Sequence, residues 1–407
     1  MPWKQSVKIG ALTVGGNAPT RLMAVINVSS ESFYKDSVVA PEASGMRAQE
    51  LEQLGAEIID VGGASSAPPE IYGTDHVSES QELNRIREAM KRIRSATDLP
   101  ISIDTTSATV AEVALDLGAD MVNDVSGLKH DPRMAQVVAS KSIPVVIMAR
   151  CHGPCQGIET TIEALRESLR IASEAGIGDD QIMIDPGVGF GRPASEDVRL
   201  IRELRRFNVM QYPVLVGVSR KAFIGSLLGH PDPKDRLIGS VAVTSIAVAH
   251  GADIIRTHDV IETREAIQVG VALREPSIEA GEIVLISDIQ EDEVCTILQT
   301  IGVDSRIRRQ LAEKGVMLNL FLHGVKTPGA LIIKQEMLAL GGDAAYHRDV
   351  IDFGTEHTDL LIMGTVSQIR RLAQKLSRMK YFGLQDISEG LYDILTQRNE
   401  IRCSEVP

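Results

Sequence analysis

The chain has 407 residues and a formal net charge of -13, with 43% hydrophobic and 24% charged residues. This length exceeds the size at which one hydrophobic core usually stops growing, so two domains are expected. The composition is typical of a globular protein, and the acidic balance argues against a general surface for nucleic acid or anionic membranes. No apolar run is long enough to span a bilayer, and the N-terminus lacks the pattern of a secretory signal. We therefore expect a cytoplasmic protein with no nucleic-acid or membrane partner.

Four cysteines are too few, in a chain of this length, for a disulfide framework. Cys151 and Cys155 flank His152 and suggest half of a metal site, but zinc sites usually pair two such clusters, and Cys295 and Cys403 stand far away. We interpret the three clustered residues as loop residues.

From Arg21 onward, short apolar runs alternate with amphipathic stretches, which is typical of repeated βα units. The expected strands are 22–28, 57–61, 100–103, 121–122, 144–148, 181–184, 213–217 and 254–255. The expected helices are 41–55, 78–96, 109–118, 132–140, 160–175, 195–205, 234–251 and 260–274. Eight consecutive units in about 270 residues match a barrel whose usual size is near 250 residues, whereas a doubly wound sheet rarely needs so many. We predict an α/β protein: a (β/α)8 TIM barrel over residues 1–276, followed by a smaller C-terminal α/β domain over 282–407.

Polar side chains follow the ends of most of these strands. In a barrel, the carboxyl ends of all strands meet at one rim, where ligands bind. The residues concerned are Asn27, Asp104, Asn123, Asp185, Lys221, Arg256 and His258. Any one of them could cap a helix or form a turn, and Asp104 and Asp124 are the leading candidates for that role. A whole ring on one rim is not explained by packing, since stabilising residues concentrate at the opposite rim.

Four members of this ring suit a flat, polar heterocycle. Asp104, Asn123, Asp185 and Lys221 offer donors and acceptors for a ligand such as a pterin, whose amino-pyrimidinone edge matches a carboxylate. The glycine-rich turn at 186–191 lets the backbone come close to such a ligand. Its glycines do not follow the G-x-G-x-x-G spacing of a dinucleotide-binding loop.

The other three members suit an anion. Guanidinium and imidazole donors on Arg256 and His258 match phosphate oxygens, and the amide oxygen of Asn27 can ligate Mg²⁺. A heterocycle beside a diphosphate suggests a displacement in which pyrophosphate leaves, helped by neutralisation of the charge on the leaving oxygens.

These residues lie in stretches that resemble dihydropteroate synthase over residues 7–274. The matching stretches are 23–28, 58–63, 101–105, 123–127, 185–191, 217–225 and 256–260. The resemblance implies a pterin-binding barrel that joins 6-hydroxymethyl-7,8-dihydropterin diphosphate to an arylamine, p-aminobenzoate, in folate biosynthesis. Pyrophosphate would be released with the help of Mg²⁺. The family is also commonly dimeric, which implies a homodimer, and the apolar stretch 237–248 fits a buried or interface helix.

The resemblance assigns a role to each matching residue. Asp104, Asn123, Asp185 and Lys221 would hold the pterin; Asn27, Arg256 and His258 would hold the diphosphate, with Asn27 also the metal ligand; Phe190, Ser66, Pro68 and Ser219 would line the arylamine slot; and Lys221, Asp104 and Asn27 would be the catalytic residues.

Three departures from the family pattern fall in loops around the arylamine. The chain has Ser66-Ala67-Pro68 where a loop arginine is common, Ala222 where serine is common, and a first loop at 29–33 that looks more like archaeal-type relatives. The acceptor could therefore be p-aminobenzoate or a ribosyl-phosphate aminobenzene of a methanopterin-type pathway. A pterin-binding methyltransferase and a non-catalytic pterin-binding protein also stay open as interpretations of the same barrel.

The C-terminal domain has no predicted role. Strands are expected at 283–286, 316–322 and 360–363, and helices at 291–300, 305–314, 329–340, 366–380 and 388–398. The stretch 341–348, with two glycines before Asp343, His347 and Arg348, is either a ligand loop or a helix C-cap followed by a turn. Lys375, Arg378 and Lys380 are expected on a solvated helix face.

Overall fold

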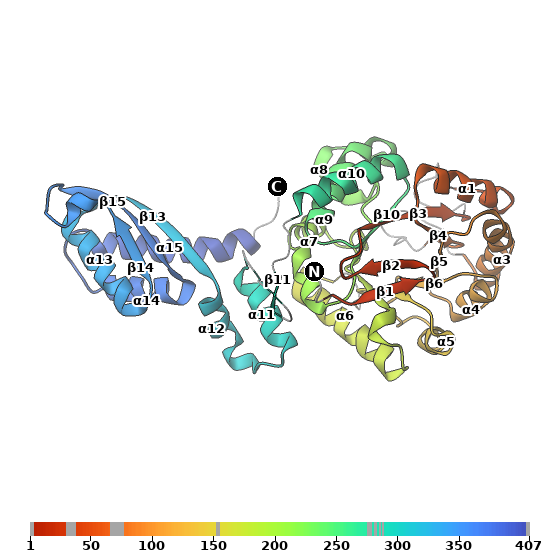
Figure 1. Ribbon diagram of the computed structural model, residues 1–407, viewed down its shortest axis with the longest axis horizontal. Coiled ribbons are helices and arrows are strands. Elements are labelled where there is room, and N and C mark those ends of the chain that lie inside the picture. The colour runs from red at the N-terminus through yellow and green to blue at the C-terminus, as the bar shows by residue number, and fades with distance from the viewer. Residues whose placement is uncertain are drawn as a thin grey trace. The chain divides into compact units, whose positions relative to one another are not determined.

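The computed structural model describes residues 4–29, 38–65, 77–151, 155–274, 279–280, 283–284, 286 and 289–403. The chain divides into two compact units, Met1–Val284 and Leu285–Pro407, and each is described by itself (Figure 1).

The first unit is the predicted (β/α)8 barrel. Its parallel strands are β3 (Arg21–Asn27), β4 (Ile58–Gly62), β5 (Ile101–Asp104), β6 (Met121–Asp124), β7 (Val145–Met148), β8 (Ile182–Asp185), β9 (Leu215–Val216) and β10 (Ile254–Thr257). Their order in the sheet is β8-β7-β6-β5-β4-β3-β10-β9. A parallel bridge between Ile184 and Val214 joins the two ends of this sheet and closes the barrel.

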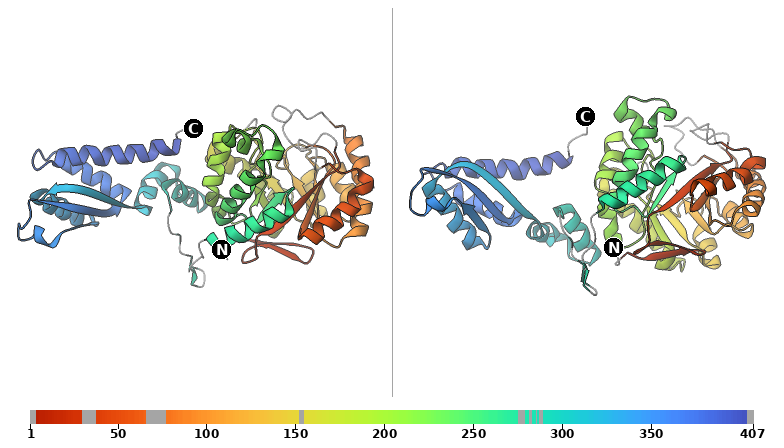
Figure 2. Two further views of the ribbon diagram at one scale, coloured as in Figure 1. Left: turned by 90° about the horizontal axis from the view of Figure 1, so that it is seen from above. Right: turned by 45° about the horizontal axis from the view of Figure 1, so that its top comes forward.

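Helices surround the strands in both views of Figure 2. They are α1 (Ser44–Leu54), α3 (Glu79–Ala96), α4 (Ala108–Asp116), α5 (Met134–Lys141), α6 (Gly157–Glu174), α7 (Ala194–Arg202), α8 (Ala222–Leu228), α9 (Leu237–Ala249) and α10 (Val260–Leu273), with short 3-10 turns at Pro41–Ala43, Asp179–Gln181, Leu204–Met210 and Pro233–Arg236. Helix α8 is not among the predicted helices, because seven residues are too few to display a helical period in the sequence.

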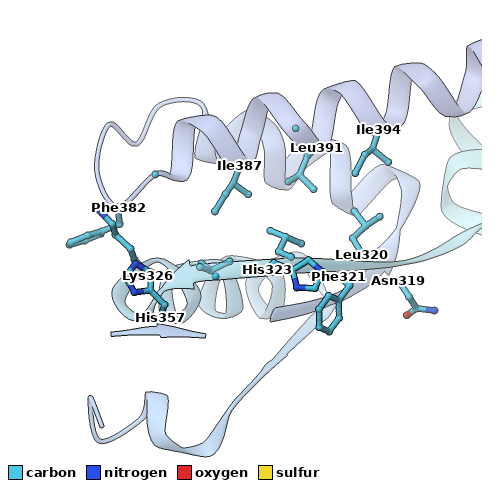
Figure 3. Close-up of a pocket in the computed structure, with 15 residues that line it drawn as sticks. Asn319, Leu320, Phe321, His323, Lys326, His357, Phe382, Ile387, Leu391 and Ile394 are labelled. Atoms are coloured by element: carbon cyan, nitrogen blue, oxygen red, sulfur yellow. The ribbon is translucent and has the colours of Figure 1, made fainter. Parts of the chain in front are cut away.

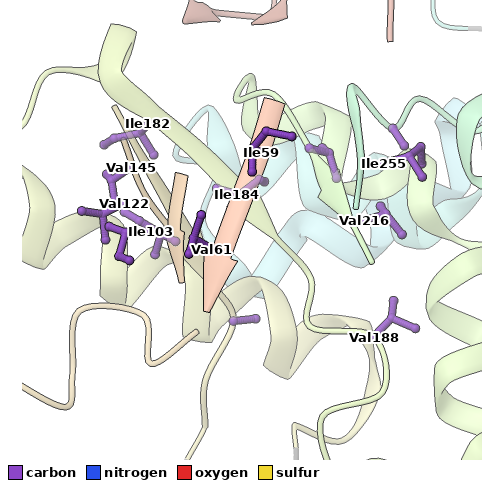
Figure 4. Packing of buried hydrophobic residues seen from close by; sticks show 14 of the residues in the cluster. Ile59, Val61, Ile103, Val122, Val145, Ile182, Ile184, Val188, Val216 and Ile255 are labelled. Carbon is purple, nitrogen blue, oxygen red and sulfur yellow. The ribbon is translucent and has the colours of Figure 1, made fainter. Parts of the chain in front are cut away.

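Every second residue of each strand faces this ring of helices. Ile59 and Val61 of β4 and Ile103 of β5 are examples, and all three are fully buried (Figure 4). Burying one such side chain contributes about 1.5–3 kcal/mol. The apolar runs that identify the strands in the sequence therefore also build the main hydrophobic core.

A short hairpin closes the end of the barrel at which the strands begin. Strands β1 (Ser6–Ile9) and β2 (Leu12–Gly15) pair antiparallel, and the hairpin buries Val7, Ile9 and Val14. These pack with the first inward-facing side chains of the barrel strands, namely Met23, Ile58, Met121, Val146, Met183, Leu215 and Ile254. Sequence analysis did not predict this hairpin, since two four-residue strands carry too weak a pattern.

A buried ion pair ties the segment before this hairpin to the barrel. Lys4 Nζ lies 2.6 Å from Asp253 Oδ2 and also donates to the carbonyl of Gly251. Asp253 immediately precedes β10 and accepts a hydrogen bond from the backbone N–H of Val214. Breaking a pair of this kind typically destabilises a protein by about 3–5 kcal/mol.

The inward-facing positions change character along the strands. The first inward-facing residues of the strands, which pack against the hairpin, form an apolar plug. Two residues further along, the inward side chains are polar: they are Asp60 in β4, Asn123 in β6, Asp185 in β8 and Arg256 in β10. Side chains in a strand alternate between faces, so each of these lies directly above an apolar plug residue. The barrel thus has an apolar floor and a polar upper interior.

The second unit is a three-stranded antiparallel sheet with helices. Its strands are β13 (Met317–Lys326), β14 (Asp343–Tyr346) and β15 (His357–Thr365), in the order β13-β15-β14. Its helices are α11 (Glu291–Thr300), α12 (Ser305–Gly315), α13 (Thr327–Leu340), α14 (Val366–Leu376) and α15 (Leu384–Cys403). Two short strands, β11 (Glu279–Ala280) and β12 (Ile283–Val284), pair near the boundary of the units.

The stretch 341–348 takes the form of a helix C-cap. Gly341 ends α13 with a φ of +84°, and the backbone N–H of Gly342 donates to the carbonyl of Met337. Residues 343–346 then form β14, where Asp343 is paired with Lys334 at 2.8 Å. The interpretation as a C-cap is confirmed, but a strand rather than a turn follows it. Helix α14 ends at Leu376, four residues earlier than predicted, so Arg378 and Lys380 lie beyond it.

The cysteines depart from the expectation. Cys151 and Cys155 are joined by a disulfide, with their Cα atoms 5.3 Å apart, whereas sequence analysis predicted no disulfide there. Cys151 lies just past the end of β7, and the disulfide holds Cys155 beside it. Among the described residues, no helix combines the length and apolarity required to cross a membrane.

Candidate functional site

The barrel brings the predicted polar residues to one rim. Strand register places Asn27, Gly62, Asp104 and Asn123 beside one another at the carboxyl ends of β3, β4, β5 and β6. Asp185 ends β8, and Lys221 follows β9 as the N-cap of α8. The side chains of Asp104, Asn123, Asp185 and Lys221 are buried, so their charges and dipoles act in a medium of low dielectric constant.

Arg256 is held between two buried carboxylates. Its Nε lies 2.6 Å from Asp60 Oδ2, and its Nη2 lies 2.8 Å from Asp104 Oδ2. Burial disfavours the charge, but Asp60 and Asp104 outweigh it and keep the pKa of Arg256 above its ordinary value. Charge-assisted bonds from two N–H groups of one guanidinium fix its position. The interpretation of Asp104 as a cap or turn residue is wrong.

Asp60 is a site residue that sequence analysis did not single out. It is fully buried on β4, directly below the rim, and it orients Arg256 from inside the barrel. The available signal was a charged residue inside the apolar run Ile58-Ile59-Asp60-Val61, because buried carboxylates are rare unless they are paired.

Asp185 and Lys221 form the second half of the site. Burial raises the pKa of Asp185 to about 6, although the backbone N–H of Gly187 donates to its Oδ1 at 2.7 Å. Burial and the nearby Arg256 lower the pKa of Lys221 to about 8. Both groups are charged at neutral pH, each against the desolvation penalty of its position.

The glycine turn between β8 and α7 is shaped around Lys221. Gly189 has a φ of +77°, and a Cβ at this position would stand 2.7 Å from Lys221 Cδ. The next residue, Phe190, places its ring 4.3 Å from Lys221 Nζ, a cation–π contact. The turn therefore needs glycine for both its conformation and its close approach to the lysine.

Two further buried residues, missed by sequence analysis, support this turn. Arg192 donates to the carbonyls of Cys155, Pro186 and Gly187, at 2.8, 3.0 and 3.1 Å. Asp197 Oδ1 accepts from the backbone N–H of Gly189 at 2.8 Å, and burial raises the pKa of this carboxyl to about 6. Both follow the strand by several residues, so only folding brings them to the turn.

His258 and Ser219 lie where β9 and β10 end. Burial, reinforced by Arg256, lowers the pKa of His258 to about 3, so the imidazole is neutral at pH 7. The hydroxyl of Ser219 lies 3.3 Å from Asp259 Oδ2 and accepts from the backbone N–H of His258. Asp259 also holds Arg220 through two ion-pair bonds, of 2.9 and 2.7 Å.

The remaining predictions have different outcomes. Asp124 is a turn residue, as predicted: its carboxylate accepts from the backbone N–H groups of Ser126 and Leu128. Ser66, Ala67 and Pro68, as well as residues 30–33 of the first loop and His152, lie outside the described residues. Among the described residues, no three His, Cys, Asp or Glu side chains gather into a metal-binding group.

Comparison with known proteins identifies the family of the chain. The family model described as "Pterin binding enzyme" matches residues 23–258. A dihydropteroate synthase of Synechocystis is 37% identical over 265 residues, which cover 62% of this chain and 90% of that protein.

Solved structures of dihydropteroate synthases are also similar to this chain. The structure of the dihydropteroate synthase of Clostridium difficile, in the presence of pteroic acid, matches with a TM-score of 0.58 at 35% identity. The match covers 98% of that chain and 63% of this one. The Xanthomonas albilineans enzyme with 4-aminobenzoic acid has a TM-score of 0.60 at 32% identity, with 98% of that chain and 66% of this one covered. The chain belongs to the dihydropteroate synthase family of pterin binding enzymes, which are transferases.

Proposed function

We propose that this chain joins 6-hydroxymethyl-7,8-dihydropterin diphosphate to p-aminobenzoate and releases pyrophosphate, as a step of folate biosynthesis. The observation that carries the proposal is one rim with two different halves. Buried carboxylates and an ammonium lie on one side, and a guanidinium and an imidazole lie at the end of β10 on the other. Family membership supports the same reaction.

The pterin would occupy the half formed by Asp104, Asn123, Asp185 and Lys221. Carboxylate oxygens of Asp185 and Asp104 accept from the amino-pyrimidinone N–H groups, while the Lys221 ammonium donates to ring acceptors. Within the described part of the chain, the buried Oδ1 of Asn123 has no hydrogen-bond partner. A buried polar atom without a partner is costly, so a ligand N–H at this position would stabilise the complex.

The diphosphate would lie against Asn27, Arg256 and His258. The hydrogen bond to Asp60 already holds the guanidinium of Arg256 at the rim. The neutral imidazole of His258 supplies one N–H donor. The nitrogen of the arylamine attacks the pterin methylene carbon, the C–O bond to the diphosphate breaks, and the amine loses a proton. Donors on the leaving oxygens lower the barrier by stabilising the charge that develops there.

Mg²⁺ fits this half as a partner of the diphosphate. Magnesium is usually bound through one or two protein oxygens together with substrate phosphates. Asn27, at the end of β3, is the residue that would hold it, by its amide oxygen. When bound, the ion would neutralise charge on the leaving diphosphate.

The arylamine would enter beside Phe190. The ring of this residue is fixed over Lys221 Nζ and offers an apolar face to an aromatic amine. Ser219 would also line this slot, and its hydroxyl is oriented by Asp259. Ser66 and Pro68 are proposed to complete the slot.

We also propose that the chain forms a homodimer in the cytoplasm. Helices α9 and α10 pack on each other and expose apolar side chains, including Ile238 (82% exposed), Val269 (53%) and Leu273 (67%). Exposed apolar surface is typical of a protein interface, and we propose that these helices contribute to the dimer interface.

The reaction itself is tested by pyrophosphate release. The wild-type chain, supplied with the pterin diphosphate, Mg²⁺ and p-aminobenzoate, is expected to release pyrophosphate, and Lys221→Ala is expected to lose this activity. A ribosyl-phosphate aminobenzene is assayed in parallel. Release with that compound alone would move the enzyme to the methanopterin-type branch, and no release with either amine would contradict the proposal.

The pKa values of the rim predict a bell-shaped pH profile. Below pH about 6 Asp185 takes up a proton and no longer accepts from the pterin, and above pH about 8 Lys221 loses its proton. Log(kcat/KM) for the pterin diphosphate is expected to fall on both sides of this range. Asp185→Asn should remove the acid limb at reduced activity, and an unchanged acid limb would contradict this assignment.

Lys221 should also destabilise the fold. Its folded pKa of about 8 lies below its ordinary value of 10.5, so the folded protein binds this proton less tightly than the unfolded chain. The loss of folding stability caused by the charged Lys221 is therefore complete below pH 8. It disappears as pH rises from 8 to about 10.5. Lys221→Met is expected to abolish activity yet raise the free energy of unfolding at pH 7 by about 1–3 kcal/mol, measured by urea denaturation.

Asp60→Asn tests the orientation of Arg256. The substitution keeps the size of the side chain but removes the charge that holds the guanidinium, and a small displacement there should lower kcat/KM by roughly 10- to 100-fold. Asp253→Asn is the matched control, because it alters a buried ion pair at the other end of the same barrel. It should lower the unfolding temperature and leave kcat/KM nearly unchanged. Equal losses of activity in both variants would contradict the role of Asp60.

The dimer is tested by sedimentation velocity. The wild-type chain of 44.1 kDa is expected to sediment as a species of twice this mass, and Ile238→Lys is expected to shift it toward the monomer, because burying a lysine at the interface is unfavourable. Met46→Lys, at another exposed apolar position on α1, serves as the control. A monomeric wild type would contradict the proposal.

A further inference from the structure

The second unit contains a groove that the proposed function does not use. It lies between β13 and α15 and has a volume of about 460 Å³ (Figure 3). Strand β13 is at the end of the sheet order β13-β15-β14, so no strand among the described residues pairs with its outer edge. An open edge presents a row of backbone N–H and C=O groups that can pair with another strand.

The edge of β13 carries little of the usual protection against strand addition, namely a register shift between Leu322 and Val325 and the terminal Lys326. Natural edge strands are often short, charged or interrupted by proline. Strand β13 has ten residues, and residues 315–325 contain no Lys, Arg, Asp, Glu or Pro. Met317 and Phe321 are 60% and 58% exposed. A long, partly apolar edge, in which the terminal Lys326 is the only Lys, Arg, Asp or Glu, is suited to binding a further strand.

Helix α15 forms the other wall of the groove. Its residues Leu384, Leu391 and Leu395 are buried in the core of this unit. The neighbouring stripe of Ile387 and Ile394 points toward β13 (Figure 3), and Ile394 stays 43% exposed. The helix therefore presents more apolar surface than its own domain covers.

Gly390 lies in this stripe, between Ile387 and Ile394. It is inside a twenty-residue helix, where glycine is a poor helix former. Apart from its two chain neighbours and the backbone of its own helix, no described atom lies within 4 Å of the position its Cβ would take. No neighbouring atom requires a glycine here. Its effect is to keep the groove open, so that another backbone can come close to α15.

The titratable side chains that line the groove are all basic. They are His323, Lys326 and His357, in a chain whose net charge is -13. His323 lies 3.6 Å from Asp359, but neither Lys326 nor His357 has an ion-pair partner among the described residues. One end of the groove therefore favours an acidic group.

We propose that this groove binds an extended peptide segment of another protein, which adds to β13 as a further antiparallel strand. Its alternate apolar side chains enter between β13 and α15, and its open backbone groups pair with the edge. Because β13 ends at Lys326, an antiparallel partner begins there, so an acidic residue precedes its apolar positions. A second copy of β13 fits less well, since this strand has no acidic residue to place beside Lys326. The site goes beyond the proposed transferase activity and does not depend on it.

The test uses the full-length chain and fluorescein-labelled peptides, with binding measured by fluorescence anisotropy. The probe is Glu-Glu-Ile-Thr-Val-Thr-Leu, with acetyl and amide ends. One control peptide has Lys-Lys in place of Glu-Glu, and another carries N-methyl groups on the backbone nitrogens that would face β13. The acidic peptide is expected to bind, and both controls are expected to bind at least ~10-fold more weakly, because they lose the charge match or the strand pairing.

Gly390→Leu and Glu389→Leu form the matched pair of variants. Both introduce leucine into adjacent positions of α15, but only the first fills the groove. Gly390→Leu is expected to weaken binding of the acidic peptide by at least ~10-fold, and Glu389→Leu by less than ~2-fold. Lys326→Glu, at an exposed position, should reverse the preference between the acidic and basic peptides. Pyrophosphate release and the unfolding temperature are measured in each variant to show that both units remain folded.

Three results would overturn the proposal. These are no binding of the acidic peptide at up to about 1 mM, equal binding of the N-methylated peptide, and unchanged binding by Gly390→Leu. Self-association of the wild-type chain that is lost in Gly390→Leu would instead assign the groove to a second copy of this chain.

Discussion

The site depends on one guanidinium held between two buried carboxylates. Arg256 is bonded to Asp60 below the rim and to Asp104 on it, and these three residues come from β10, β4 and β5. One positive and two negative charges in a low-dielectric interior are stable only when their geometry is close to ideal. A disturbance of the barrel that separates these strands therefore also disturbs the rim, which couples the precision of the fold to that of the site.

The interior of the barrel divides its two tasks between its two ends. Apolar inward-facing residues and the hairpin β1–β2 close the end where the strands begin, and there the pair of Lys4 and Asp253 fixes the N-terminal segment. Polar inward-facing residues occupy the other end, where desolvation opposes the charges of Asp185 and Lys221. Packing at the apolar end stabilises the fold and offsets the unfavourable desolvation of the charges at the rim, as is expected of an enzyme barrel.

The C-terminal unit differs from the barrel in leaving part of its apolar surface uncovered. Its small core is formed between one face of a three-stranded sheet and its helices, and the edge strand β13 and part of α15 stay uncovered. Apolar surface that a domain does not bury itself is expected to be buried by something else. The barrel thus presents a site for small molecules and the C-terminal unit a site for a protein strand, and neither site requires the other.

The sequence by itself determined the barrel, its strands and most of the rim, because short apolar runs between amphipathic stretches identify the strands of repeated βα units, and strand ends identify one edge. For Gly341, local chemistry left two interpretations open, a ligand loop or a helix C-cap, and the structure shows the C-cap. The sequence did not reveal the hairpin β1–β2, the short helix α8, or the disulfide of Cys151 and Cys155, since those elements are short and their contacts are made only on folding. Nor did it reveal the roles of Asp60, Arg192 and Asp197. Their partners are distant in the chain or are backbone groups, and such pairings are decided by tertiary structure, which alone sets the distances between groups that the sequence separates.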